Sequence, residues 1–184
     1  MAETFGAIGK FANDMHIINS DYSISIIKAG TGVTITEFDN NTVKTFDLPK
    51  VTIETAEIKR QTSAIKYANG RTIGDVTLTA ERFKNGSMLK FWQDWINAVY
   101  KKQLGAAAGQ NVNAMSSYKG TIKLSEYDIK GNVVAEYTLY GVFPKEFDPG
   151  GSKDVTASDN SVMSITLSVD DWDLKINGTG LTNI

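Results

Sequence analysis

The sequence contains no cysteine, a single histidine and no long apolar run. Without cysteine the chain forms no disulfide, no thiolate zinc site and no cysteine nucleophile, so burial alone must stabilise the fold. No apolar stretch approaches the roughly 20 residues of a membrane-spanning helix, and the first twenty residues lack a basic start followed by a hydrophobic segment. We therefore expect no membrane anchor and a chain that folds in the cytosol.

An excess of basic charge is also missing. The formal net charge is -2 and the pI is about 5.4, which argues against a surface built to grip nucleic acid by neutralising phosphates. A length of 184 residues with 41% hydrophobic content fits one domain with a real core. We expect that domain over 21–174, with an N-terminal arm over 1–20 and a C-terminal tail over 175–184.

The arm has two readings. Phe5, Ile8, Ala12 and Met15 have the spacing of a short amphipathic helix, and the alternative is an arm that becomes ordered only against a neighbour.

A two-residue alternation of apolar and polar side chains dominates the sequence. Between 75 and 82, Val76, Leu78 and Ala80 form one face and polar residues form the other, and 161–170 alternates in the same way. Further strands are expected at 22–27, 33–38, 43–46, 51–58, 118–127 and 133–142, separated by turn residues. The predicted fold is mainly β, a sandwich or barrel of two antiparallel sheets.

One segment, 87–104, has helical spacing instead. Its apolar positions recur every three or four residues, which predicts one amphipathic helix that flanks the sheets. Ser87 is expected to cap its start, Lys101 and Lys102 suit its C-terminal dipole, and Gly105 is the expected stop. The residues expected to pack this helix against the core are Phe91, Trp92, Trp95 and Val99.

Two polar segments, 105–117 and 148–160, have little apolar periodicity and are predicted to be surface loops. Long loops inside a compact domain are usually functional or disordered.

The sequence offers no convincing catalytic or metal site. His16 is the lone histidine, and a base without a partner is more often exposed or structural. Asp170, Asp171 and Asp173 surround Trp172, but neighbouring strand residues point to opposite faces, so solvated charge is the simpler reading. The two Gly-Thr-Gly stretches at 30–32 and 178–180 lack the spacing of a phosphate loop. We predict no enzyme activity, no metal and no cofactor.

From Phe46 to Trp172 the chain resembles the tail tube protein family of contractile-tailed bacteriophages, which is similar to the tube proteins of pyocins, other contractile injection systems and type VI secretion. The matching segments occur in the family's order, although each is weak alone. They are Leu48-Pro49, the charged segment to Arg71 and Ile73, the strand 75–79, the Phe91-Trp92-x-x-Trp95 helix, the hairpin from 119–124 to 139–144, and the closing 165–172.

The resemblance implies a structural virion protein of the contractile tail. Six copies would form a homohexameric ring, neighbouring sheets would join into one barrel, and stacked rings would form the tube through which DNA is ejected without sequence-specific binding. The implied partners are further copies of the chain, a sheath protein, a baseplate tube initiator, a tape measure protein and a tail terminator. The implied location is the virion tail, after assembly in the cytoplasm of the host bacterium.

Two sets of surface residues are candidates for these roles. The first set lies on the polar faces of the predicted strands and is predicted to line the channel: Glu54, Asp75, Thr77, Thr79, Glu81, Ser164 and Thr166. The alternative is that these residues belong to the ordinary outer surface. The second set lies in the polar segments 57–71 and 148–160 and is predicted to contact other subunits or rings: Glu57, Lys59, Arg60, Lys66, Arg71, Asp148, Lys153 and Asp154. For the segment 57–71 the alternative is a solvated hairpin.

Three alternatives remain open from the sequence. The first is a baseplate tube initiator, or the tube of a secretion or injection machine. The second is a carbohydrate-binding β-sandwich, but Trp92 and Trp95 lie on the apolar helix stripe and Trp172 ends a core strand, so none is an obvious sugar platform. The third is an enzyme, which would need a set of catalytic residues that the sequence does not contain.

Overall fold

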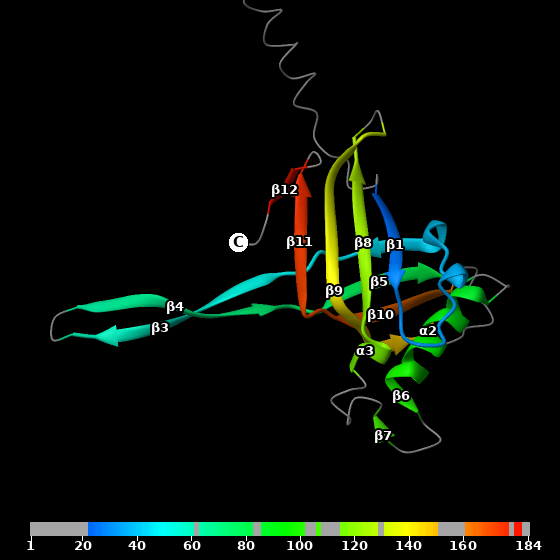
Figure 1. Cartoon of the computed structure of the whole chain (residues 1–184), viewed down its shortest axis with the longest axis horizontal. Helices are drawn as coiled ribbons and strands as arrows, with labels where there is room; N and C mark the ends of the chain where they lie inside the picture. The colour runs from blue at the N-terminus through cyan, green and yellow to red at the C-terminus, as the bar shows by residue number, and fades with distance from the viewer. Residues whose placement is uncertain are drawn as a thin grey trace, which may run out of the picture.

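A computed structural model describes residues 22–60, 63–82, 86–101, 106–107, 115–128, 131–150, 161–176 and 179–181. Strands dominate these residues, as the alternation predicts, and one longer helix lies against them (Figure 1). The strands are β1 (Tyr22–Lys28), β2 (Val43–Phe46), β3 (Val51–Lys59), β4 (Ala64–Ile73), β5 (Val76–Glu81), β6 (Tyr100–Lys101), β7 (Ala106–Ala107), β8 (Gly120–Tyr127), β9 (Val133–Asp148), β10 (Val162–Ser168), β11 (Asp171–Ile176) and β12 (Thr179–Leu181). The helices are α2 (Ser87–Val99) and α3 (Met115–Tyr118), with 3-10 turns η1 (Ile35–Glu37) and η2 (Asn40–Thr42).

All strand pairs are antiparallel, and the main path runs β1-β8-β9-β10-β5-β2, with β11 beside β9 and β12 beside β11. The path divides into two sheets that cross in Figure 1. The first sheet holds β1, β8, residues 133–142 of β9, β11 and β12. The second sheet holds residues 143–148 of β9, β10, β5 and β2.

Strand β9 belongs to both sheets and turns the corner between them. At Gly141, just before the corner, φ is +64°, a conformation that L side chains rarely adopt. A Cβ at this position would also collide with the Asp170 carboxylate. Glycine is therefore required where β9 leaves the first sheet.

The core lies between the two sheets. The predicted alternation is confirmed in β5, where Val76, Leu78 and Ala80 are buried, and in β10, where Met163, Ile165 and Leu167 are buried. The first sheet contributes inward-facing residues such as Ile24, Ile122 and Leu139. The mainly β fold predicted from the sequence is correct.

Helix α2 covers one end of this core with aromatic side chains. Phe91, Trp92 and Trp95 are fully buried, and the two indole rings stack with centroids 5.7 Å apart. Val99 is only partly buried but packs against the same core. The helix stripe predicted from the sequence therefore faces the sheets.

The ends of α2 differ from the prediction. The N-cap is Gly86 with φ +66°, and Ser87 is the first helical residue. The helix ends at Val99, because Tyr100 is extended and begins β6, which pairs with β7. Lys101 is thus a strand residue, whereas Lys102 and Gly105 lie outside the described residues.

Two predicted strands are shorter than expected or absent. The segment 33–38 is not a strand, because residues 35–37 form the turn η1. The strand expected from 118 begins at Gly120, after α3, which lies in part of the predicted loop 105–117.

The C-terminal strands extend beyond the predicted end of the domain. β10 ends at Ser168 and a new strand, β11, places Trp172 opposite Leu139 of β9. β11 and β12 continue the first sheet as far as Leu181, into residues for which the sequence predicts a tail. The N-terminal arm, 1–20, lies outside the described residues.

Strands β3 and β4 pair only with each other among the described strands and project from the body as a long hairpin (Figure 1). They follow β2 and precede β5, so the hairpin prolongs one side of the second sheet.

Candidate assembly surfaces

The outer face of the second sheet is a band of hydroxyl groups. Thr77 lies opposite Thr166, and Thr79 lies opposite Ser164, so β5 and β10 present their polar residues together. Thr45 of β2 extends the band, since its hydroxyl lies 2.5 Å from that of Thr79. These hydroxyl-bearing residues cover the side of the sheet that faces away from the core.

Carboxylates border this band. Glu81 lies at the end of β5, and its carboxylate lies 2.8 Å from the Lys44 ammonium. Glu146 lies opposite Thr166 and Asp148 opposite Ser164, so both acidic residues of β9 share the hydroxyl face. We call this surface the hydroxyl-carboxylate face, made of Thr45, Thr77, Thr79, Glu81, Glu146, Asp148, Ser164 and Thr166.

Five of the seven predicted channel residues lie on the hydroxyl-carboxylate face. The other two do not: Asp75 precedes β5 and pairs with the Lys145 ammonium at 2.6 Å, and Glu54 lies on the hairpin, where it accepts a hydrogen bond from Thr72. The hydrogen bond to Asp75 raises the pKa of Lys145. The sequence missed Glu146, because Pro144 hides the continuation of β9 past Val142.

The hairpin has one charged and one apolar face near its free end. By register, Glu57 lies opposite Lys66 on one face, while Ala56 lies opposite Tyr67 and Ile58 opposite Ile65 on the other. Ile58 is 54% exposed, Ile65 47% and Tyr67 46%, which is unusual for side chains of this size. We call Ala56, Ile58, Ile65 and Tyr67 the apolar tip face.

A β-bulge between Glu54 and Thr55 separates this tip from the base of the hairpin. Along β3 the apolar residues change face at the bulge, because Val51 and Ile53 share the face of Glu57, whereas Ile58 lies on the opposite face. The base is tied to the body by the Arg71–Asp171 ion pair at 3.1 Å and by a hydrogen bond from Gly74 N to Lys50 O at 2.8 Å.

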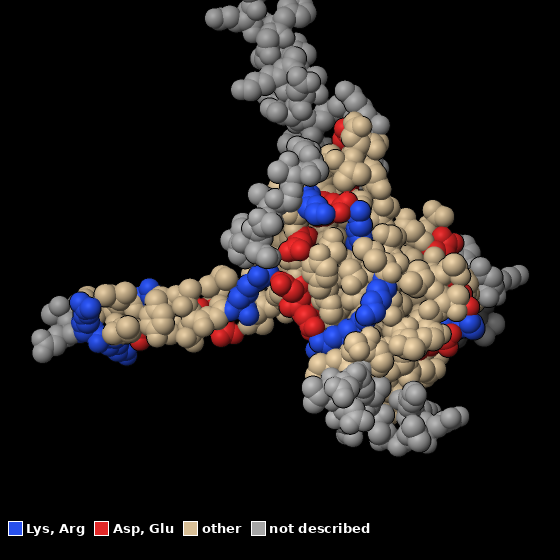
Figure 2. All heavy atoms as spheres, in the orientation of Figure 1, with Lys and Arg blue, Asp and Glu red and all other residues tan. Residues whose placement is uncertain are grey.

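The predicted contact residues are therefore dispersed. Glu57, Lys59 and Lys66 share the charged face near the tip, Arg60 begins the turn, and Arg71 faces the body. Figure 2 shows the cations gathered near the free end of the hairpin. Asp148 belongs to the hydroxyl-carboxylate face, and Lys153 and Asp154 lie outside the described residues.

The aspartates around Trp172 do not form one site. Asp170 pairs with Lys119 at 2.5 Å, Asp171 with Arg71, and Asp173 hydrogen-bonds Tyr140, whose pKa is raised by partial burial and by this contact. Within the described ranges, no group of three or more His, Cys, Asp or Glu could hold a metal ion. No described helix is long and apolar enough to cross a membrane.

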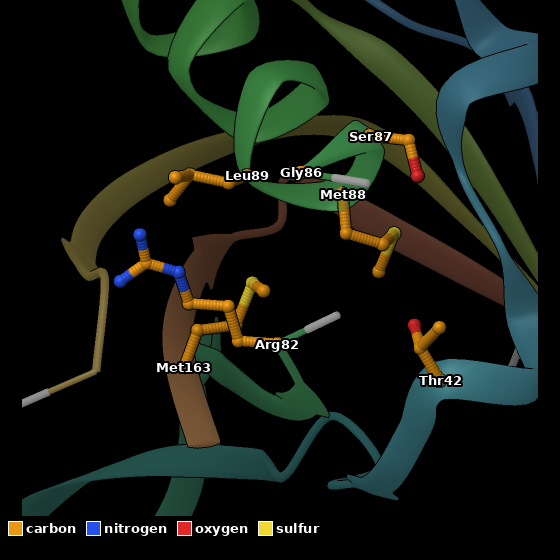
Figure 3. Close-up of a pocket in the computed structure, with 7 residues that line it drawn as sticks. All are labelled: Thr42, Arg82, Gly86, Ser87, Met88, Leu89 and Met163. Atoms are coloured by element: carbon orange, nitrogen blue, oxygen red, sulfur yellow. The ribbon is translucent and has the colours of Figure 1, made fainter. Parts of the chain in front are cut away.

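A small hollow lies where α2 begins. Figure 3 shows that it is lined from the start of the helix and from the neighbouring strands. Its volume of about 10 Å³ has room for about one water molecule, so it is not a ligand site. The lining residues are Thr42, Arg82, Gly86, Ser87, Met88, Leu89 and Met163.

The fold and its surfaces define a mainly β protein with a crossed-sheet core and a projecting hairpin. The model of the phage tail tube protein family matches residues 18–172, and the chain belongs to this family. The family is structural and non-enzymatic, as predicted from the sequence.

Solved structures share the fold at low sequence identity. A chain of the sheath-tube complex of the extracellular contractile injection system PVC, in its extended state, has a TM-score of 0.63 at 19% identity, over 91% of this chain and 97% of that chain. A chain of the tube-terminating cap of the anti-feeding prophage has a TM-score of 0.62 at 21% identity, over 96% and 99%. A type six secretion system protein has a TM-score of 0.51 at 12% identity, over 89% and 91%. The comparison with curated proteins finds no match.

Proposed function

We propose that the protein builds the tail tube of a contractile-tailed phage, as six-membered rings that stack around a channel for DNA. Membership of the tail tube family supports the tube role, and the shared fold with chains of a sheath-tube complex supports the contractile setting. The subunit is assembled in the host cytoplasm and resides in the virion tail.

The observation that carries the proposal is the hydroxyl-carboxylate face, which we assign to the channel. DNA carries one negative charge per roughly 1.7 Å of axis, so a basic lining would hold it tightly. This face presents Glu81, Glu146 and Asp148 among hydroxyls, and the Lys44 ammonium that reaches it is paired with Glu81. A neutral to acidic wall lets DNA slide.

Closure of a ring also suits the sheet edges. Joining the sheets of neighbouring subunits pairs backbone groups that would otherwise lie exposed at strand edges, where they promote aggregation. The wall of the channel would then be one continuous β-barrel, with the hydroxyl-carboxylate faces turned inward.

The hairpin is assigned to the contact with the next ring. An isolated two-stranded hairpin is marginally stable in water, and this one exposes its apolar tip face. A neighbouring subunit that covers Ile58, Ile65 and Tyr67 would remove this apolar surface from water. Glu57, Lys59, Arg60 and Lys66 would make the charged part of the contact, and Arg71 would hold the base. Lys153 and Asp154 would serve contacts between subunits, whereas Asp148 would line the channel with the rest of its face.

The remaining partners are a sheath protein, a baseplate tube initiator, a tape measure protein and a tail terminator. Proteins of this fold come from a sheath-tube complex, a baseplate and a tube-terminating cap, which supports the sheath, initiator and terminator.

Electron microscopy of the purified protein tests the proposal. Rings or tubes of uniform width are expected, either spontaneously or after addition of a tube end as seed. Protein that stays monomeric across concentration and salt, even with the seed, would overturn it.

A second candidate is the tube of an injection machine, or a baseplate tube initiator, because proteins of this fold occur in such assemblies. The genes next to this one decide between them, since a phage tail is encoded beside head and packaging proteins. A carbohydrate-binding module fits less well, because Trp92 and Trp95 are fully buried.

A further inference from the structure

The two ends of the strand path are separated by a gap, which the hydrogen bond from Tyr22 of β1 to Lys44 of β2 spans. β1 and β2 are the terminal strands of this path, and no described strand pairs with their outer edges. The segment from η1 to η2, residues 35–42, connects them, and both turns contact β1. We call this gap the seam.

Each edge of the seam has one backbone group held by a side chain. The N–H of Ile24 in β1 donates to Asn40 Oδ1 at 2.7 Å. The carbonyl of Lys44 in β2 accepts from the Tyr22 hydroxyl at 2.9 Å. An added strand would need these same two groups for its ladder.

The segment that carries Asn40 is fixed in place by helix α2. The Phe38 ring packs edge-on against Phe91, with centroids 5.5 Å apart. The N–H of Asp39 donates to the Met88 sulfur at 3.3 Å, and Glu37 pairs with Lys90. Asn40 is therefore presented to β1 by a segment that already belongs to the core, rather than by a free loop.

The Tyr22 hydroxyl is a protonated donor at neutral pH, as in any tyrosine with an ordinary pKa near 10, and burial raises its pKa further. This hydroxyl donates to the Lys44 carbonyl, which would otherwise be free to accept a hydrogen bond from the strand of another molecule.

We propose that Asn40 and Tyr22 are edge guards, which block strand addition at the seam and confine the pairing of a second copy of this chain to backbone groups other than those of Ile24 and Lys44. Asp47 N donates to Thr77 O within the second sheet, so Phe46 points its backbone groups outward by alternation. Lys44 lies at a register shift of β2, and its carbonyl is directed to the Tyr22 hydroxyl. With Lys44 occupied, a joint with a second copy along β2 begins at Phe46 and runs toward the hairpin. The identity of this partner rests on the proposed function, but the guarding of the seam does not.

The experiment uses the full chain and the variants Asn40→Ala and Tyr22→Phe, each of which deletes one guarding hydrogen bond. Asn41→Ala is the matched control, because Asn41 is exposed in the same turn and next to Asn40. Thioflavin fluorescence and light scattering follow irregular aggregation, and electron microscopy counts regular tubes. Both guard variants should aggregate about fivefold faster than the parent and the control, the factor expected for one hydrogen bond.

Rescue separates guarding from simple packing. Asn40→Asp keeps an acceptor oxygen for Ile24 N, so it should aggregate at the parent rate. Equal aggregation of Asn40→Ala, Tyr22→Phe and the parent would overturn the proposal, and so would fast aggregation of Asn40→Asp.

If Asn40→Ala fails to fold, Tyr22→Phe and Asn40→Asp decide by the same readouts. A parent that builds no tubes would contradict the proposed function alone, because aggregation at the seam is measured without tubes.

Discussion

Gly120 lies directly against the indole of Trp95. A Cβ at Gly120 would come within 2.7 Å of the Trp95 ring and closer still to the backbone carbonyl of Lys28. The indole N–H donates to the carbonyl of Tyr118 at 2.7 Å, two residues before this glycine. Helix α2 can therefore pack this closely against the start of β8 only because the large Trp95 ring meets a glycine, which has no side chain.

The first prediction follows from this contact. Trp95→Ala removes a fully buried ring and should lower the free energy of unfolding by roughly 3 to 5 kcal/mol. Chemical denaturation checks the value. Trp95→Phe keeps a ring but loses the hydrogen bond to Tyr118, so its free energy of unfolding should lie between those of the parent and Trp95→Ala. A Trp95→Ala variant as stable as the parent would show that α2 does not pack as described.

Gly120→Ala should be strongly destabilising, because its Cβ meets backbone and a locked indole rather than a flexible side chain. Gly131→Ala is the control: φ there is +80°, but nothing lies within 4 Å of the added Cβ. The control should cost only about 1 kcal/mol of backbone strain. Melting temperatures in the reverse order would contradict the packing at Gly120.

The sequence predicts the elements whose side chains are sorted by burial alone. Val76, Leu78 and Ala80 alternate because one face of β5 lies in the core, and the α2 stripe recurs at helical spacing for the same reason. Such patterns are local, so they can be recognised without knowledge of the partner element.

The errors arise where a distant contact decides the local structure. The segment 33–38 alternates like a strand, but Phe38 joins the aromatic rings of α2 and the backbone turns into η1. The sequence does not predict the start of β11, because the turn at Val169 and Asp170 contains no glycine or proline. The sequence does not reveal the apolar tip face, because the charged residues of 57–71 suggest a polar segment. The pairing of β3 with β4 is needed to show that charged and apolar side chains lie on opposite faces.

Partial burial raises the pKa of Glu126, so the folded state disfavours the ionised carboxylate. This group therefore lowers stability at neutral pH, and the penalty disappears as pH falls through the folded pKa toward the unfolded value near 4.5. Glu126→Gln should raise the melting temperature at pH 7 and have little effect near pH 4. Thermal unfolding of parent and variant across this range is the measurement, and a difference that is constant with pH would contradict the burial of this carboxylate.

Ile58→Ser combined with Ile65→Ser should leave the stability of the subunit nearly unchanged, because both side chains are about half exposed. Tube yield should fall, since the apolar tip face would no longer stabilise the contact between rings. Ile35→Ser, at an exposed isoleucine outside the hairpin, is the control. Normal tubes from the double variant would exclude the tip face from assembly.

Charge reversal of Lys59 and Arg60 to glutamate tests the other side of the hairpin. Both side chains are exposed near the free end, and exposed charges contribute little to folding, so the melting temperature should change by less than about two degrees. If these cations meet carboxylates of the next ring, tube formation should fail or become strongly dependent on salt, because a Debye length of about 8 Å at physiological ionic strength screens such contacts. Lys28→Glu, at an exposed lysine on β1, is the control for a charge reversal outside the hairpin and should build normal tubes. The measurement is the tube yield of the parent, the double variant and the control at several salt concentrations, together with their melting temperatures. A double variant that unfolds early would mean that the charged face stabilises the subunit, and one that builds tubes at the parent yield would mean that the hairpin contacts no neighbour through Lys59 and Arg60.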